Sequence, residues 1–186
     1  AAANELAGLQ KRSQLLKALI LIEMGRMEKA RQAAAELKSL IENQMNRKLV
    51  RMSDYVTGMI ELKSGNSRPA SEHLAKAVSL MPFQWYRDHE HGIFLEGLAQ
   101  AYYKSGDMEK ARREYERVTS LTAGRMKWGD IYAKSFYMLG KIAEQQGQKA
   151  KAIERYQKFL DLWKDADPGF PEVADAQKRL TGLRGT

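Results

Sequence analysis

A six-residue pattern, Gly-x-x-x-x-Ala, recurs four times along the chain at nearly constant spacing. Its glycines are Gly25, Gly65, Gly106 and Gly147, and its alanines are Ala30, Ala70, Ala111 and Ala152. Successive alanines are separated by 40 or 41 residues. A period of this length, with helix-forming residues between the glycines, is typical of an array of helical hairpins. The four copies in register therefore predict a chain built of repeated helical units.

The residues around each glycine predict how one unit folds. Because each glycine lies between two helix-forming runs, we expect it to end the first helix in the left-handed backbone conformation. Asn66 and Asp107 follow two of the glycines and are suited to cap the second helix. The pattern alanine allows two helices to approach closely, and Leu74, Tyr115 or Tyr156 follows it by four residues. Each unit is thus predicted to be a helical hairpin.

These residues resemble the tetratricopeptide repeat, which has a small residue and an aromatic in its first helix, glycine at the turn, and alanine and an aromatic in its second. The best copy holds Leu139, Gly140, Gly147, Ala152 and Tyr156. The resemblance extends over most of the chain, although the period exceeds the roughly 34 residues usual for the family. It implies an all-α fold, a right-handed superhelical array of four hairpins plus a C-terminal capping helix.

We expect residues 1–186 to form a single domain of this kind. The predicted units and cap cover residues 4–45, 47–81, 88–122, 130–164 and 171–184. The residues in excess of the usual repeat lie between units, and we expect lengthened helices or ordered loops there. The final helix is expected to cover the open end of the array.

Composition and charge leave a binding role open. The chain has no cysteine, so disulfides, thiolate metal sites and a cysteine nucleophile are excluded. Its formal charge is +8, which raises nucleic acid as an alternative partner. Residues 1–92 carry 14 Lys/Arg and 10 Asp/Glu, and residues 93–186 carry 17 and 13. This even spread favours a solvated surface over a basic binding patch.

No motif in the sequence indicates catalysis or a bound cofactor. Asp88-His89-Glu90-His91 is the one local cluster that suggests a metal, but no third ligand is evident, so a solvated segment is favoured. The acidic residues at 161–172 lack the spacing of a calcium loop. Phosphate-binding, dinucleotide-binding and zinc-protease motifs are missing. We therefore expect no enzymatic activity, no metal and no cofactor in this chain.

The resemblance implies a peptide-binding groove along the first helices of the units. Alignment on the turn glycines gives the predicted groove residues, which are Leu15, Leu19, Met52, Tyr55, Met59, Ile93, Glu96, Gln100, Tyr103, Lys134, Tyr137 and Lys141. Their spacing of three to four residues places each set on one helical stripe. Glu96 and Gln100 depart from the Lys, Asn and Arg residues with which the best-known groove of the family holds a terminal carboxylate.

The first two units differ from the last two in where their apolar residues fall. Positions expected to pack within the hairpin hold polar residues such as Gln14 and Asp54, whereas the groove positions are apolar. Two interpretations remain open. Either these first helices are rotated relative to the alignment, or the N-terminal groove is apolar and needs a cover.

We therefore expect a non-catalytic protein- or peptide-binding scaffold, with a partner that could be another protein, a domain of its own parent or a second copy. The alternatives are a ligand- or nucleic-acid-associated regulatory module and a homo-oligomerisation domain.

Residues 124–130 and 163–168 resemble tetratricopeptide tails of bacterial regulatory proteins, and the start at Ala1 suggests a piece of something longer. The apolar run at 15–22 is too short to span a membrane. We expect a soluble domain; the sequence leaves its compartment open, with the cytoplasm slightly favoured.

Overall fold

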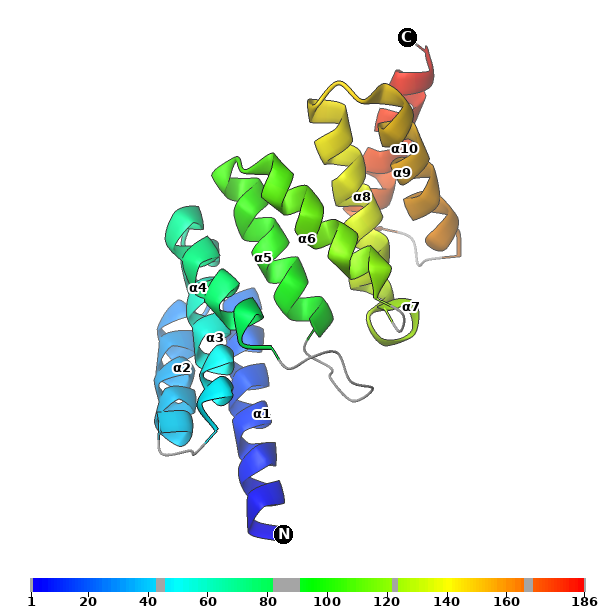
Figure 1. Cartoon of the computed structure of the whole chain (residues 1–186). Helices are drawn as coiled ribbons and strands as arrows, with labels where there is room; N and C mark the ends of the chain where they lie inside the picture. The colour runs from blue at the N-terminus through cyan, green and yellow to red at the C-terminus, as the bar shows by residue number, and fades with distance from the viewer. Residues whose placement is uncertain (1, 43–45, 82–90, 122–123, 166–168, 186) are drawn as a thin grey trace. The chain divides into compact units, whose positions relative to one another are not determined.

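The computed structural model describes residues 2–42, 46–81, 91–121, 124–165 and 169–185, and these residues are helical with no strand among them (Figure 1). The elements are α1 (Ala2–Glu23), α2 (Met27–Glu42), a 3-10 helix η1 (Arg47–Leu49), α3 (Val50–Lys63), α4 (Ser67–Ser79), α5 (His91–Ser105), α6 (Met108–Ser120), α7 (Gly124–Lys127), α8 (Gly129–Gln145), α9 (Lys149–Leu162) and α10 (Pro171–Gly185). The predicted all-α helical repeat fold is confirmed.

The chain divides into two compact units at the third turn glycine. Unit 1 comprises Ala1–Gly106 and unit 2 comprises Asp107–Thr186. Within unit 1, α1 packs on α2 and α3 packs on α4, while α2 also contacts α3 and α4 contacts α5. Within unit 2, α8 packs on α9 and contacts α6, and α10 packs mainly on α9. We call α1, α3, α5 and α8 the first helices, because each precedes the second helix of a hairpin, and we count α10 with them because it follows α9 in the place of the next first helix.

The turn glycines take the left-handed conformation that the sequence predicts. Gly25 ends α1 with φ 69° and Gly147 ends α8 with φ 70°. In each turn the amide after the glycine donates to a carbonyl five residues earlier, at 2.9 Å from Arg26 and 2.8 Å from Gln148. This bond closes the helix end and satisfies a carbonyl that the helix leaves without a partner. The same local geometry therefore turns the chain at both ends of the array.

The two predicted side-chain caps differ in outcome. The Asp107 carboxylate accepts a hydrogen bond from the Lys110 amide at 3.2 Å, as expected of an N-cap residue. Asn66 occupies the N-cap position of α4, but its side chain makes no cap bond. The Asn66 amide instead donates to the Glu61 carboxylate at 2.7 Å. The prediction of an Asn66 side-chain cap is therefore wrong, because the side-chain amide of Asn66 is hydrogen-bonded to the Glu61 carboxylate.

The hairpins pack in a common register. Gly58 and Gly140 each lie seven residues before a turn glycine. A Cβ at Gly58 would lie 2.6 Å from Leu74 Cγ, and one at Gly140 would lie 2.7 Å from the ring of Tyr156. Ala18 holds the same position in α1 and is fully buried. At this one position α1, α3 and α8 thus each carry a small residue, glycine or alanine.

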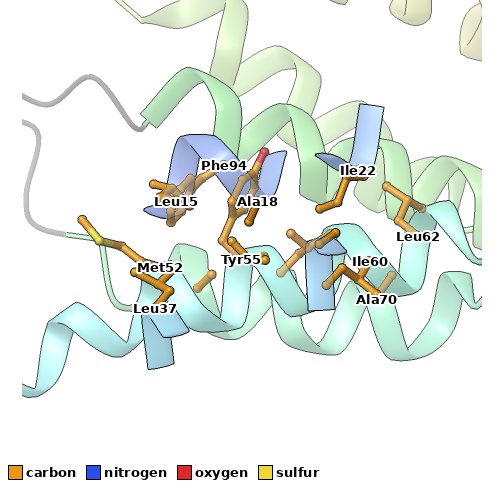
Figure 2. Close-up of a cluster of buried hydrophobic side chains, with 14 of the residues drawn as sticks. Leu15, Ala18, Ile22, Leu37, Met52, Tyr55, Ile60, Leu62, Ala70 and Phe94 are labelled. Carbon is orange, nitrogen blue, oxygen red and sulfur yellow. The ribbon is translucent and has the colours of Figure 1, made fainter. Parts of the chain in front are cut away.

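Unit 1 has a continuous apolar core to which α1, α2, α3, α4 and α5 all contribute (Figure 2). Its centre is the pair Tyr55 and Phe94, whose rings stack with centroids 4.1 Å apart and planes inclined by 6°. Leu15 and Ala18 of α1 and Met52 of α3 lie in the same cluster. Burial of such residues is the main force that holds the five helices together.

The core of unit 2 combines aromatic side chains with alanines and a leucine. Tyr137 of α8 contacts the rings of Tyr156 and Phe159 of α9, with centroids 6.1 and 5.4 Å apart. Trp163 extends this series towards the last helix, and Phe170 meets it edge-on at 4.6 Å. Phe170, which directly precedes α10, is thus tied to the hairpin by aromatic packing.

Candidate peptide-binding face

Four of the predicted groove residues are buried. Leu15, Met52 and Tyr55 expose 4, 5 and 4% of their surface, and Tyr137 exposes 8%. They belong to the cores of their units, so they present no open surface to a partner. The prediction that these four side chains line an open groove is corrected by this burial.

The cause of the burial is contact between successive first helices. The Tyr55 ring lies on Phe94, and its hydroxyl donates to the carbonyl of Ile93 at 3.0 Å. Because Gly58 holds the expected register, α3 is not rotated relative to the alignment. The position ten residues before the turn glycine is therefore a packing position between successive first helices of one compact unit.

Tyr137 makes the corresponding contact in unit 2. Its hydroxyl donates to the Asp175 carboxylate of α10 at 2.7 Å. Burial and this hydrogen bond raise the pKa of Tyr137 above its ordinary value, so the hydroxyl stays protonated and remains a donor at neutral pH. Tyr137 thus serves to attach the last helix.

A polar network that the sequence did not reveal surrounds this contact. Arg179 donates to Asp175 at 2.6 Å and to Glu144 at 3.0 Å, and Glu144 also accepts from the hydroxyl of Tyr156 at 2.7 Å. Burial raises the pKa of Asp175, but the bonds from Arg179 and Tyr137 outweigh it and leave that pKa lowered. The network joins α8, α9 and α10 through carboxylates that already accept hydrogen bonds within unit 2, which suits a structural role.

The other predicted groove residues of unit 1 are half-buried and lie on α1, α3 and α5. Leu19, Met59 and Gln100 each lie six residues before a turn glycine. Three more half-buried residues of α5 accompany them. We define the unit 1 row as these six residues, Leu19, Met59, Ile93, Glu96, Gln100 and Tyr103.

The packing beneath the unit 1 row fixes its side chains. Leu19, Met59 and Ile93 pack against the core on one side and keep part of their surface open. A Cβ at Gly97 would lie 3.1 Å from Met59 Sδ, so the missing side chain lets α5 approach α3. The Gln100 amide donates to the Glu96 carboxylate at 3.1 Å, which orients both polar groups. The row therefore combines apolar and hydrogen-bonding groups on a firm support.

The two lysines predicted for the groove lie on α8 and already have contacts within unit 2. The Lys134 ammonium lies 3.6 Å from the Glu172 carboxylate and 5.8 Å from the centroid of the Trp163 ring. Lys141 lies over the ring of Tyr137, 5.4 Å from its centroid. These contacts orient both cations above an aromatic surface, where each keeps part of its side chain exposed.

Metal binding and membrane spanning have no support in the described residues. There, no three or more His, Cys, Asp or Glu side chains are grouped so as to hold a metal ion. The predicted cluster at 88–91 lies outside the described residues except for His91, which is buried. None of the helices in the described part of the chain combines the length and apolar character that a membrane span needs.

One exposed surface was missed by the sequence reasoning. Leu6, Leu9, Leu16 and Ile20 of α1 each expose 57 to 59% of their surface. A shallow hollow runs along this side of the helix, and its lining residues are Leu9, Arg12, Ser13, Leu16, Lys17, Ile20 and Leu21. The signal was present in the sequence, because apolar residues occur on every side of this helix and not along one stripe.

Comparison with known families agrees with the fold. Tetratricopeptide repeat families match residues 12–44, 94–124 and 134–166, which together make up more than half of the chain. The chain belongs to the tetratricopeptide repeat family. Repeats of this family are generally protein-interaction scaffolds. The comparison with curated proteins gives no match.

Proposed function

We propose that the chain is a non-catalytic scaffold that binds a segment of another protein along the unit 1 row. The observation that carries the proposal is the repetition of half-buried Leu19, Met59 and Gln100 at one register on three helices of one compact unit. Such a row presents side chains at regular intervals, and covering its partly exposed apolar members with a ligand is favourable in free energy.

The composition of the row specifies the kind of segment. Leu19, Met59 and Ile93 suit apolar side chains of a peptide, while the amide of Gln100 and the carboxylate of Glu96 suit its polar groups. A carboxylate next to Glu96 would be repelled, since like charges in close contact are unfavourable. We therefore propose an internal segment with apolar side chains flanked by a hydrogen-bond donor or a cation, and not a free C-terminal carboxylate.

The proposal is tested by selecting peptides from a random library on the immobilised chain. Hydrogen exchange of the protein would then be compared with and without a selected peptide. We expect added protection in α1, α3 and α5, because these helices carry the row, and little change in α2 and α4. Protection confined to the second helices, or a selection that yields only peptides ending in a recognised free carboxylate, would contradict the proposal.

A further inference from the structure

Helix α1 has two apolar sides. Leu15, Ala18 and Ile22 point into the core of unit 1. A second set of residues lies on the exposed side of the helix at intervals of three or four positions. We define the outer stripe as Leu6, Leu9, Ser13, Leu16 and Ile20, in which the four apolar side chains are each more than half exposed. Patches of this kind on a folded unit mark interaction surfaces.

The register of the repeat shows that the outer stripe is a packing surface without a partner in the described part of the chain. Leu16 lies nine residues and Ile20 five residues before the turn glycine of α1. The residues of α3 at these positions are Val56 and Ile60, which expose 0 and 3% of their surface. Ile142 of α8, at the position of Ile20, is fully buried. The later first helices therefore bury what α1 leaves open.

The last helix does not share this property. The exposed residues of α10 include Gln177, Lys178 and Thr181, so its outer side is polar. Covering the outer stripe with α10 of another molecule would bury these polar groups against apolar side chains, which is costly without hydrogen-bond partners. Head-to-tail stacking of two copies is thus disfavoured, and the surface best matched to an α1 outer stripe is another outer stripe.

The outer stripe is close to symmetric about Ser13. Leu6 and Ile20 lie seven residues on either side of it, and Leu9 and Leu16 lie four before and three after. In an antiparallel pair of α1 helices that cross at Ser13, Leu9 of each copy would meet Leu16 of the other, and Leu6 would meet Ile20. This is the self-complementarity that a two-fold interface requires. The small side chain of Ser13 permits close approach at the crossing.

The size of the surface fits a modest dimer. Each exposed apolar side chain of the outer stripe offers on the order of 100 Å2, so two copies would bury roughly 800 Å2 from these side chains alone. The aliphatic parts of Arg12 and Lys17, which border the hollow, add to this area. The sum approaches the lower end of about 1,200 Å2 for specific interfaces. We propose that a second copy of the chain covers the outer stripe, as an antiparallel α1 pair with Ser13 at the two-fold axis.

The first test is the molar mass of the chain by light scattering over a range of concentrations. We expect a concentration-dependent dimer, and at least ten-fold weaker association in the double variant Leu16→Glu and Ile20→Glu. Both positions are exposed, so the thermal midpoint of the separated monomer should change little. Met126→Glu is the matched control, because Met126 is exposed in α7 outside the outer stripe, and it should dimerise like the wild type. A wild type that stays monomeric throughout would overturn the proposal.

The second test fixes the geometry and does not depend on the charged variants folding. The chain has no cysteine, so Ser13→Cys carries one thiol per copy. Helix axes 8–10 Å apart, with Cα atoms about 2.3 Å from each axis, place facing Cα atoms roughly 3.4–5.4 Å apart, which overlaps the range of a disulfide. In a buffer of oxidised and reduced glutathione, in which the oxidised form accepts the two electrons, Ser13→Cys should form a covalent dimer much faster than Thr181→Cys on α10. Equal rates, or a dimer of Ser13→Cys that never cross-links, would contradict the antiparallel pair.

Discussion

Tyr55 and Tyr137 make the same contact in the two compact units. Each lies ten residues before a turn glycine and donates its hydroxyl to a residue 38 positions later in the next first helix. Tyr55 donates to the backbone carbonyl of Ile93 at 3.0 Å, and Tyr137 donates to the carboxylate of Asp175 at 2.7 Å. Successive first helices are therefore linked at a fixed register by a buried phenol.

Replacing each tyrosine by phenylalanine removes only the hydroxyl. For Tyr55→Phe we expect a loss of about 0.5–1.5 kcal/mol in the free energy of unfolding, because the acceptor is a neutral carbonyl. For Tyr137→Phe we expect about 1.5–3 kcal/mol, because the acceptor is an ionised carboxylate. Urea unfolding of the two variants measures both values. A larger loss for Tyr55→Phe than for Tyr137→Phe would contradict this assignment.

The division between core and row predicts different effects for two neighbours on α3. Tyr55→Ser should lower the free energy of unfolding by about 3–5 kcal/mol, since it removes the centre of the unit 1 core. Met59→Ser should cost about 1 kcal/mol, because Met59 is only half-buried and packs at the edge of that core. Thermal unfolding compares them directly. Equal losses would show that Met59 is also a core residue.

Gly140 tests the close packing of α8 on α9. An added Cβ would lie 2.7 Å from the Tyr156 ring. This ring cannot move aside freely, because it is buried and its hydroxyl donates a hydrogen bond to Glu144. We expect the overpacking in Gly140→Ala to lower the free energy of unfolding by about 1–3 kcal/mol. The higher helix propensity of alanine offsets about 1 kcal/mol of this loss.

The matched control is Gly182→Ala in α10, where an added Cβ has no neighbour within 4 Å. Without a clash, only the propensity gain of up to about 1 kcal/mol remains, and this variant should be more stable than the wild type. Chemical denaturation of both variants decides the point. Stabilisation by Gly140→Ala would mean that α8 and α9 are not in close contact there.

The lowered pKa of Asp175 makes the attachment of α10 sensitive to acid. Its folded pKa lies below the value of about 3.9 expected in the unfolded chain. The carboxylate therefore stabilises unit 2 at neutral pH, and this contribution is lost as the pH falls through the folded pKa. The urea midpoint should be higher for the wild type than for Asp175→Asn at pH 6, and the gap should narrow below about pH 4. A gap that widens in acid would reverse the assigned sign.

Features that depend on local chemistry could be predicted from the sequence. The turn glycines require a left-handed backbone that few other residues adopt, so Gly25 and Gly147 mark the helix ends reliably. The close contact of Gly140 with Tyr156 follows from small and aromatic residues at fixed offsets from those turns. Both are properties of one hairpin and need no knowledge of its neighbours.

Features that depend on contacts between neighbouring hairpins could not be predicted from the sequence. The spacing of Tyr55 places it on a stripe of α3, but only the position of α5 decides that Phe94 covers it. Asp175 and Arg179 are four residues apart on α10, a spacing that local reasoning can use, but Arg179 and Glu144 are 35 positions apart, which gives no local signal. Leu16 and Ile20 were missed because apolar residues surround α1, so periodicity selects no single face.

If the unit 1 row is the binding surface, replacing its apolar residues should weaken the affinity of a library-selected peptide. Isothermal titration would compare the wild type with the double variant Leu19→Ser and Met59→Ser, and with Glu72→Ala, an exposed change on the second helix α4. We predict that the double variant binds at least ten-fold more weakly while remaining folded, and that Glu72→Ala binds like the wild type. Unchanged affinity in a folded double variant would show that the unit 1 row is not the binding surface.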